Sequence, residues 1–299
     1  MSAGTVIVTG RRSADRELIK TVIAPFVTTH AAPDRMSGLL LRQPPTGICP
    51  VTFGLSPAFN AFVTRRIVEV TKMVGAVVKP ARKCRPDVQV VFTTDPQGLV
   101  NTLSRRTNSD ILGVHYVSET KALSRVSRAI QAWYVTGTIS DTGPYAVTIT
   151  TRGGAASPTG LVKLDDAYED TTYSGLGSHI PPRNSSQIVS TLIVVDSNKV
   201  EGREIGPISD YIAMLALSQA QSKSLDMCGP LPSILDLMAA GCQTRPAPES
   251  LTEGDIAFLK ALYSADITTS GKAAGVRIER SMAKALGRAA LDQAKSSTP

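Results

Sequence analysis

The sequence predicts an α/β (α+β) protein with one main domain, in which helices pack on a mixed, mostly parallel sheet and the C-terminal part is helical. Three observations favour this fold class. Residues 188–195 form an almost continuous run of apolar and β-branched side chains, which is typical of a strand buried on both faces. A strand–helix–strand pattern follows Cys49. Two further helical patterns, at 207–219 and 251–263, follow the buried run.

Composition and charge limit the classes of function. With 299 residues, of which 42% are hydrophobic and 19% charged, the chain can bury a globular core. No apolar run approaches the roughly 18 residues that a membrane-spanning helix needs, so no membrane span is predicted. The net charge of +7 comes from basic residues scattered as pairs, and aromatic residues make up only 5%. A solvated basic surface is therefore favoured over nucleic-acid binding.

The chain divides into three expected parts. Residues 1–48 predict an N-terminal strand, helix and linker, residues 49–266 the main domain, and residues 267–299 a C-terminal helix or tail. The strand is expected at 6–10 and the helix at 14–28. Between them the sequence lacks the second and third glycines of a dinucleotide-binding loop, which excludes that class of site.

The main domain opens with clear local signals. Ser56 and Pro57 fit the cap and first position of a helix, and apolar side chains recur at helical spacing up to Gly75. A glycine after the last apolar position is a common helix stop. Strands are predicted at 77–80 and 86–92, the second of them interior to the sheet.

The middle of the chain mixes helices with a predicted hairpin. Helices are expected at 96–103 and 120–130. Strands at 133–135 and 145–150 are expected to pair around a turn near Gly143. The Gly-, Ser- and Pro-rich residues that follow, up to 187, predict a long surface loop.

Four cysteines allow three disulfide pairings, and the nearest-neighbour choice joins Cys49 to Cys84 and Cys228 to Cys242. Disulfides would indicate an oxidising compartment. The alternative is four buried free thiols in a cytosolic protein. No signal peptide is visible, so the chain is either cytosolic or a mature form with a start methionine added. Given the cysteines, we expect the mature form of a periplasmic or secreted protein.

The region from residue 188 to 266 has the order strand, helix, Pro-bracketed turn and capped helix. This order resembles the catalytic half of the metzincin-type zinc proteases. The likeness is greatest to exported proteobacterial proteins that are metzincin-like but lack the zinc motif. A start similar to Ile-Val-Val-Thr-Gly, here at 6–10, is shared with that group. The turn at 232–238 is similar to the Ser-Ile-Met turn of that family, and 251–263 to its last helix. The resemblance covers roughly residues 50–266.

Metzincins hold zinc with H-E-x-x-H-x-x-G-x-x-H, in which the i, i+4 spacing puts two imidazoles on one helix face. The resemblance places the ligand positions on Ser209, Ala213 and Gln219, the glutamate position on Asp210, and the floor of the cleft on Met238. Alanine has no donor atom, and serine and glutamine are poor zinc ligands. The resemblance therefore implies a vestigial cleft with no metal, no cofactor and no catalytic residue.

The function expected from this resemblance is a non-catalytic, exported binding or interaction module for a peptide or protein partner. An extended peptide added to an edge strand such as 145–150 is the natural mode. One alternative is an active, peptidase-like hydrolase that uses His179, Asp210 and His115. A second alternative is a basic nucleic-acid-binding protein. Four acidic residues lie close together in the sequence and could supply oxygen ligands to calcium: Asp165, Asp166, Glu169 and Asp170. They lack the glycine and the spacing of a calcium-binding loop, so a solvated acidic turn is predicted.

Overall fold

The computed structural model describes most of the chain outside one long internal segment. The described residues are 16–31, 33, 38, 40–80, 84–105, 112–113, 120–140, 184–220, 228–242, 246–265 and 270–296. The strands expected at 6–10 and 145–150, the turn near Gly143 and the loop up to 183 lie outside these residues.

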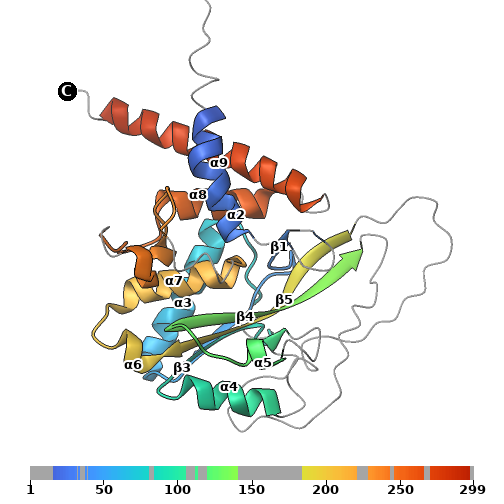
Figure 1. Cartoon of the computed structure of the whole chain (residues 1–299), viewed down its shortest axis with the longest axis vertical. Helices are drawn as coiled ribbons and strands as arrows, with labels where there is room; N and C mark the ends of the chain where they lie inside the picture. The colour runs from blue at the N-terminus through green and yellow to red at the C-terminus, as the bar shows by residue number, and fades with distance from the viewer. Residues whose placement is uncertain are drawn as a thin grey trace, which may run out of the picture.

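The centre of the described part is a five-stranded mixed sheet, mostly parallel as predicted (Figure 1). Its strands are β1 (Leu41–Arg42), β2 (Pro50–Phe53), β3 (Val88–Thr93), β4 (Ile130–Ser140) and β5 (Asn184–Asp196). β5 pairs in parallel with β1 along its first half and with β3 along its second half, and β2 lies beyond β3. β4 runs antiparallel along the other side of β5 and, among the described strands, is the edge strand there.

β5 is apolar on both faces because both faces of the sheet are covered. Ile193 and Val195 point into the larger core, whereas Leu192 and Val194 point into a second, smaller core on the opposite face. This alternation follows from the two-residue period of a strand. The continuous apolar run in the sequence is therefore explained by helices on both sides of the sheet.

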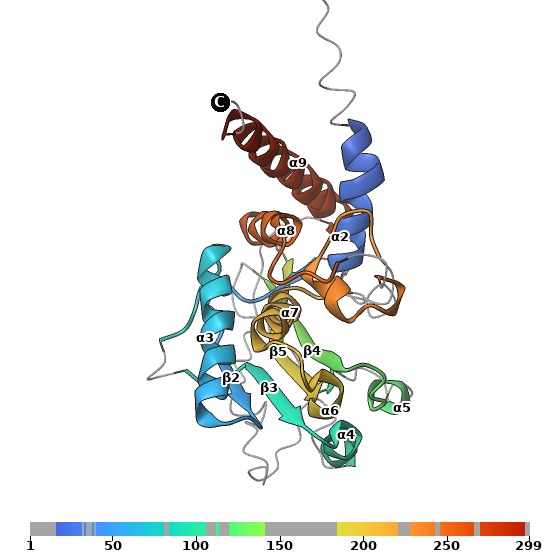
Figure 2. The same ribbon diagram turned by 90° about the vertical axis from the view of Figure 1, so that its left-hand side faces the viewer.

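Helices α3 (Pro57–Met73) and α7 (Ile205–Leu217) cover one face, and α4 (Pro96–Arg105) covers the other (Figures 1 and 2). α3 begins at Pro57 after Ser56 and ends before Gly75, as the sequence predicted. Gly75 has a φ of 81°, a left-handed conformation that side chains with a Cβ rarely adopt. Two short helices, α5 (Thr120–Leu123) and α6 (Ser197–Val200), complete the sheet layer.

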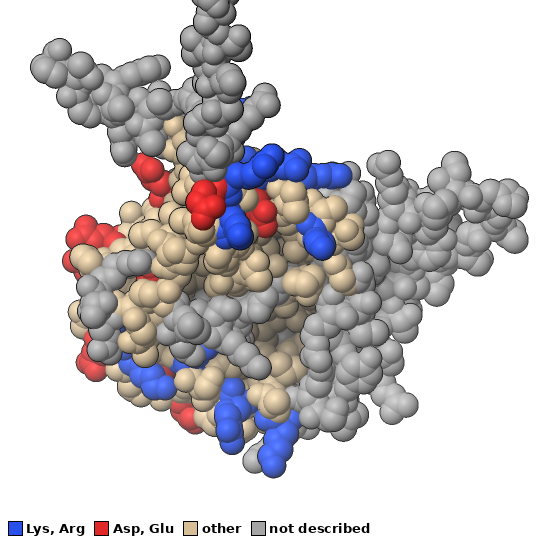
Figure 3. All heavy atoms as spheres, turned by 45° about the horizontal axis from the view of Figure 1, so that its top comes forward, with Lys and Arg blue, Asp and Glu red and all other residues tan. Residues whose placement is uncertain are grey.

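A second helical layer lies on top of α7 (Figure 2). It contains η1 (Ile19–Ile23), α2 (Ala24–His30), α8 (Glu253–Ser264) and α9 (Gly271–Ser296), with the short turns η6 (Ile234–Met238) and η7 (Ala240–Cys242) beside it. Buried side chains of this layer belong to the same core as those of α3 and α7. Viewed from this end, the surface carries Lys and Arg side chains with a few acidic ones among them (Figure 3). Among the described helices, none is both long enough and apolar enough to cross a membrane.

Three local predictions were wrong. The helix expected at 120–130 ends at Leu123. The Gln131 side chain fixes the next turn, because it accepts from the Ser127 N–H and donates to the Arg125 carbonyl. Instead of a strand at 77–80 there is a single bridge between Ile48 and Val78. The last residues of the predicted loop, 184–187, are the start of β5.

Candidate functional site

Helix α7 is where the metzincin resemblance places the functional residues, and it is the most buried helix among the described residues. All ten residues from Ile208 to Leu217 are buried. Ser209 and Ala213 have no exposed surface, and Asp210 is 2% exposed. These three side chains therefore lie in the core, and a ligand cannot reach them without rearrangement of the fold.

The Asp210 carboxylate is fully engaged inside the protein. Arg66, from α3, donates from Nε to Oδ1 at 2.5 Å and from Nη2 to Oδ2 at 3.1 Å. The backbone N–H of Leu251, just before α8, donates to Oδ2 at 3.0 Å. The bond to Asp210 raises the pKa of Arg66 above its usual value, which outweighs the effect of desolvation. Asp210 thus joins α3, α7 and the start of α8.

The other predicted cleft residues do not form a ligand set with Asp210. The Ser209 hydroxyl donates to the Ile205 carbonyl at 2.6 Å, within its own helix. Gln219 lies beyond the end of α7, and its side-chain oxygen has no hydrogen-bond partner within the described part of the chain. Met238 ends η6, which packs against α7, and its side chain is half-buried against the core. The donor atoms present here do not suit a zinc ion.

Side chains from three other elements anchor the C-terminal end of α7. The last carbonyls of a helix lack partners within the helix and need them from elsewhere when buried. Tyr134 of β4 donates to the Leu215 carbonyl at 2.9 Å, and Tyr263 of α8 donates to the Leu217 carbonyl at 2.9 Å. The Gln43 amide, which follows β1, donates to the Ala216 carbonyl at 2.6 Å. Burial raises the pKa of both tyrosines well above the usual value, so both hydroxyls stay protonated donors.

A second buried polar cluster joins α2, η6 and α8. Ser233 donates from Oγ to Asp255 Oδ1 at 2.7 Å, and His30 Nε2 lies 3.3 Å from the same hydroxyl oxygen. Asp255 Oδ2 accepts from the backbone N–H groups of Ile234 and Thr252. Thr252 and Asp255 also form the predicted capping box at the start of α8.

The three side chains His30, Ser233 and Asp255 are those of a hydrolase triad, but their arrangement is different. In a triad the histidine lies between the serine and the carboxylate, and the serine is open to substrate. Here the serine lies between the other two, and all three are at most 5% exposed. Burial lowers the pKa of His30 to about 4 and raises that of Asp255, partly offset by its hydrogen bonds to Ser233, Ile234 and Thr252. The cluster holds three elements together and has no accessible nucleophile.

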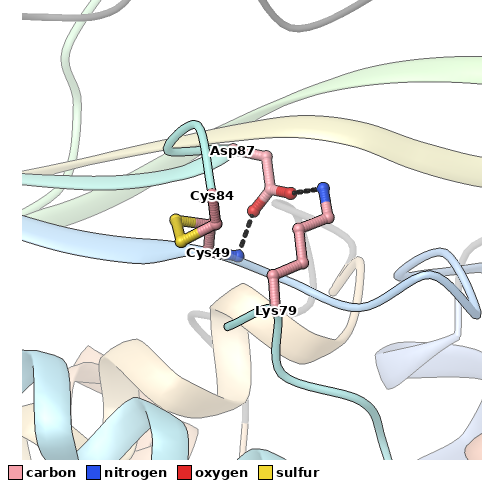
Figure 4. Close-up of a disulfide and its surroundings, with 4 residues drawn as sticks. All are labelled: Cys49, Lys79, Cys84 and Asp87. Atoms are coloured by element: carbon pink, nitrogen blue, oxygen red, sulfur yellow. Dashed lines mark hydrogen bonds and ion pairs between the residues drawn. A yellow bond between two sulfur atoms is a disulfide. The ribbon is translucent and has the colours of Figure 1, made fainter. Parts of the chain in front are cut away.

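The structure contains both disulfides of the nearest-neighbour pairing, Cys49–Cys84 and Cys228–Cys242. The first lies beside a partly buried ion pair between Lys79 and Asp87 (Figure 4). Asp87 accepts from the Cys49 N–H at 2.7 Å and from Lys79 Nζ at 2.7 Å, so the carboxylate fixes the chain on both sides of the disulfide.

The second disulfide closes a loop around η6 and η7. The Asp236 carboxylate lies near both sulfur atoms, with the candidate ligand atoms of the three residues within 4.8 Å of one another. Disulfide sulfurs are not thiolates, and thiolates are the form that binds zinc. In the oxidised protein this cluster is therefore a covalent link, which holds the turn beneath α7 in place.

The partners that define these clusters carry no local sequence signal. Arg66 belongs to one of the scattered basic pairs, Arg65-Arg66, and nothing in the local pattern of α3 marks it as the partner of Asp210. His30 and Gln43 lie in segments expected to be a helix end and a loop. His115, His179, the acidic cluster at 165–170 and the expected edge strand at 145–150 lie outside the described residues.

Comparisons of the chain with protein-family models, with curated proteins and with solved structures found no significant match.

Proposed function

We propose that this chain is an exported, non-catalytic protein of metzincin-like architecture that binds a peptide or protein partner. The observation that carries the non-catalytic part is the state of Asp210. The carboxylate at the position of the metzincin glutamate is buried, paired with Arg66 and bonded to the Leu251 N–H. A general base needs to reach its substrate directly or through one water molecule. Asp210 serves the packing of three elements instead.

The order of elements supports the metzincin-like part of the proposal. An antiparallel edge strand, β4, precedes the interior strand β5, and α7, η6 and α8 follow β5 in turn. η6 packs against α7, as a turn beneath the former metal helix would. Asp255 of α8 bonds to the start of η6, which ties the last helix to that turn.

Two disulfides support export, because disulfides persist in oxidising compartments and are rare in the cytosol.

The outer edge of β4 is the binding surface that we propose. β4 pairs with β5 on one side, and no other described strand pairs with it. The backbone of Gly113 covers the edge at Tyr134, since a Cβ on Gly113 would lie 2.0 Å from the Tyr134 carbonyl oxygen. A peptide would therefore add beside the last part of β4, at 137–140, where no other described strand pairs with the outer edge and an extended partner could use its backbone donors and acceptors.

Metal analysis tests the non-catalytic part. The protein is dialysed against zinc chloride, then against metal-free buffer, and its zinc content is measured. We expect no stoichiometric zinc, together with no hydrolysis of casein or of a mixed peptide library. One tightly held zinc per chain, or zinc-dependent hydrolysis, would overturn the proposal.

Hydrogen exchange tests the binding part. A random-peptide display library is selected on the full chain, and backbone exchange is compared with and without the selected peptide and its scrambled counterpart. We expect protection concentrated at residues 137–140, produced by the selected peptide only. Protection at another surface, or failure to select any peptide above background, would contradict the proposed edge.

A further inference from the structure

Helix α9 carries a basic stripe on the side that faces away from the protein. Ala274, Ile278 and Met282, spaced four residues apart, are fully buried and fix which side packs against the core. Arg277, Arg280 and Lys284, at i, i+3 and i+7, are exposed and lie within about 60° of one another around the helix axis, with Arg280 opposite the buried side. These three residues are called the basic stripe below.

One acidic residue, Glu279, lies within this part of α9. It lies about 100° around the helix axis from Arg280 and further from Arg277, so it does not interrupt the stripe. From Arg277 to Lys284 the stripe is about 10 Å long at the rise of an α-helix.

The positive charge of the described protein is concentrated at this end. η1 runs beside α9 and adds the exposed Lys20, and the exposed Arg16 and Glu17 precede it. Figure 3 shows Lys and Arg side chains at this end with acidic side chains among them, and further basic side chains at the lower edge of the view. Outside α9 and residues 16–30, the described side chains include 12 Lys and Arg and 11 Asp and Glu, which is close to balance. The stripe is therefore a local excess of charge and not a sample of a uniformly basic surface.

We propose that this face of α9 binds the surface of an anionic phospholipid bilayer. A straight row of cations on an amphipathic helix matches a plane of phosphate groups. Val276, beside the stripe, is 36% exposed. An exposed aliphatic side chain next to a row of cations could enter the boundary between headgroups and acyl chains when the cations contact phosphate groups. α9 has no aromatic residue on which a base could stack, which favours lipid over single-stranded nucleic acid.

Vesicle co-sedimentation of the full chain tests this. Vesicles of pure phosphatidylcholine are compared with vesicles of phosphatidylcholine and phosphatidylglycerol at about two to one. We expect binding to the anionic vesicles only. Binding should fall steeply when NaCl is raised from about 0.1 M to about 0.5 M, because the screening length shortens from about 10 Å to about 4 Å. Equal binding to both vesicles, or no binding to either, would overturn the proposal.

Charge-neutral variants locate the surface. Arg277→Gln, Arg280→Gln and Lys284→Gln are combined in one protein, and each lost charge is expected to weaken binding about fivefold. The matched control combines Lys121→Gln, Arg125→Gln and Arg203→Gln, which remove the same charge from exposed positions. α5 and α6, near which these control residues lie, are at the end of the molecule away from α9 (Figure 1). The control should bind within about twofold of the unmodified chain.

Two further measurements separate folding and nucleic acid from lipid binding. Circular dichroism should show unchanged helix content in both variants. The variant that combines Arg277→Lys and Arg280→Lys should keep vesicle binding, since it keeps the charge. Loss of binding equally in the stripe variant and the control would overturn the assignment. Stripe-dependent binding to duplex DNA without binding to anionic vesicles would replace it with a nucleic-acid surface.

Discussion

At the residue scale, the most consequential side chain of the described protein is Asp210. It is a buried carboxylate whose charge is balanced by one guanidinium that remains 28% exposed. Breaking a buried pair by removing the cation leaves an uncompensated charge in the core, which is far more costly than losing the pair itself. Removal of Arg66 therefore leaves a buried, unpaired carboxylate, and the resulting loss in the free energy of unfolding measures how strongly the core depends on this cation.

Replacement of Arg66 by Met is expected to lower the free energy of unfolding by about 3 kcal/mol, measured by urea denaturation at neutral pH. The neighbouring Arg65→Met is the matched control. Arg65 is exposed, lies 4.0 Å from Glu69 and stacks over Phe62, so its loss should cost less than about 1 kcal/mol. Equal losses from the two variants would show that the Arg66–Asp210 pair does not matter to stability.

His30 makes stability depend on pH. Burial lowers its pKa from 6.5 to about 4, so between these values the unfolded chain binds more protons than the folded one. Stability is therefore lost as the pH falls from 6.5 toward 4, by up to about 3 kcal/mol from this residue. Asp255 acts in the opposite sense, because its pKa is raised by folding and its contribution is lost as the pH rises through the folded value.

The variant His30→Gln isolates the histidine from Asp255. Its free energy of unfolding should fall less than that of the unmodified chain as the pH is lowered through this window. Chemical denaturation at several pH values between about 7 and about 4 measures both slopes. Identical slopes in the two proteins would contradict the assignment of the pH dependence to His30.

At the element scale, single side chains cap the ends of buried helices. Arg42 of β1 donates from Nη1 to the carbonyls of Leu262, Tyr263 and Ala265 at the C-terminal end of α8. A cation at this end also complements the helix dipole. β1 has only two residues, and through Arg42 it links the sheet to the second helical layer.

Arg42→Met is expected to lower the free energy of unfolding by about 2 kcal/mol, because three carbonyls lose a charged donor. Thermal denaturation followed by circular dichroism measures the change. Lys260→Met removes an exposed cation from α8 and should leave the midpoint nearly unchanged. A similar midpoint for Arg42→Met and the unmodified chain would show that water replaces the guanidinium without cost.

At the scale of the whole molecule, two covalent links restrain the unfolded chain. Cys49–Cys84 joins residues 35 apart and Cys228–Cys242 joins residues 14 apart. In the chain-entropy model the longer loop gives about 4 kcal/mol of stabilisation and the shorter about 3 kcal/mol. The second link also holds the turn that packs beneath α7.

Paired Cys→Ala variants test these links separately. We expect each pair to lower the midpoint of urea denaturation, with the Cys49/Cys84 pair having the larger effect. Non-reducing peptide mapping of the unmodified chain should recover only the two pairings seen in the structure. Mixed pairings, or recovery of four free thiols, would contradict the covalent framework.

The sequence by itself determined the local elements wherever one signal was strong. Ser56-Pro57 and Gly75 bounded α3, and the Thr252–Asp255 capping box marked the start of α8. The apolar run of β5 predicted a buried strand, because a strand with one face in water would alternate apolar and polar side chains. The prediction of a helix after Leu123 was wrong. The hydrogen bond from the Ser127 N–H to the Gln131 side chain outweighs helical propensity there.

Only the tertiary structure decided what the polar residues do. Asp210 and Arg66 are 144 residues apart, and His30 and Ser233 are 203 apart. No local pattern connects such pairs, because a buried charge finds its partner through the packing of whole elements and not through spacing along the chain. The sequence therefore identified α7 as a helix without zinc ligands, and the fold showed that its one carboxylate serves structure.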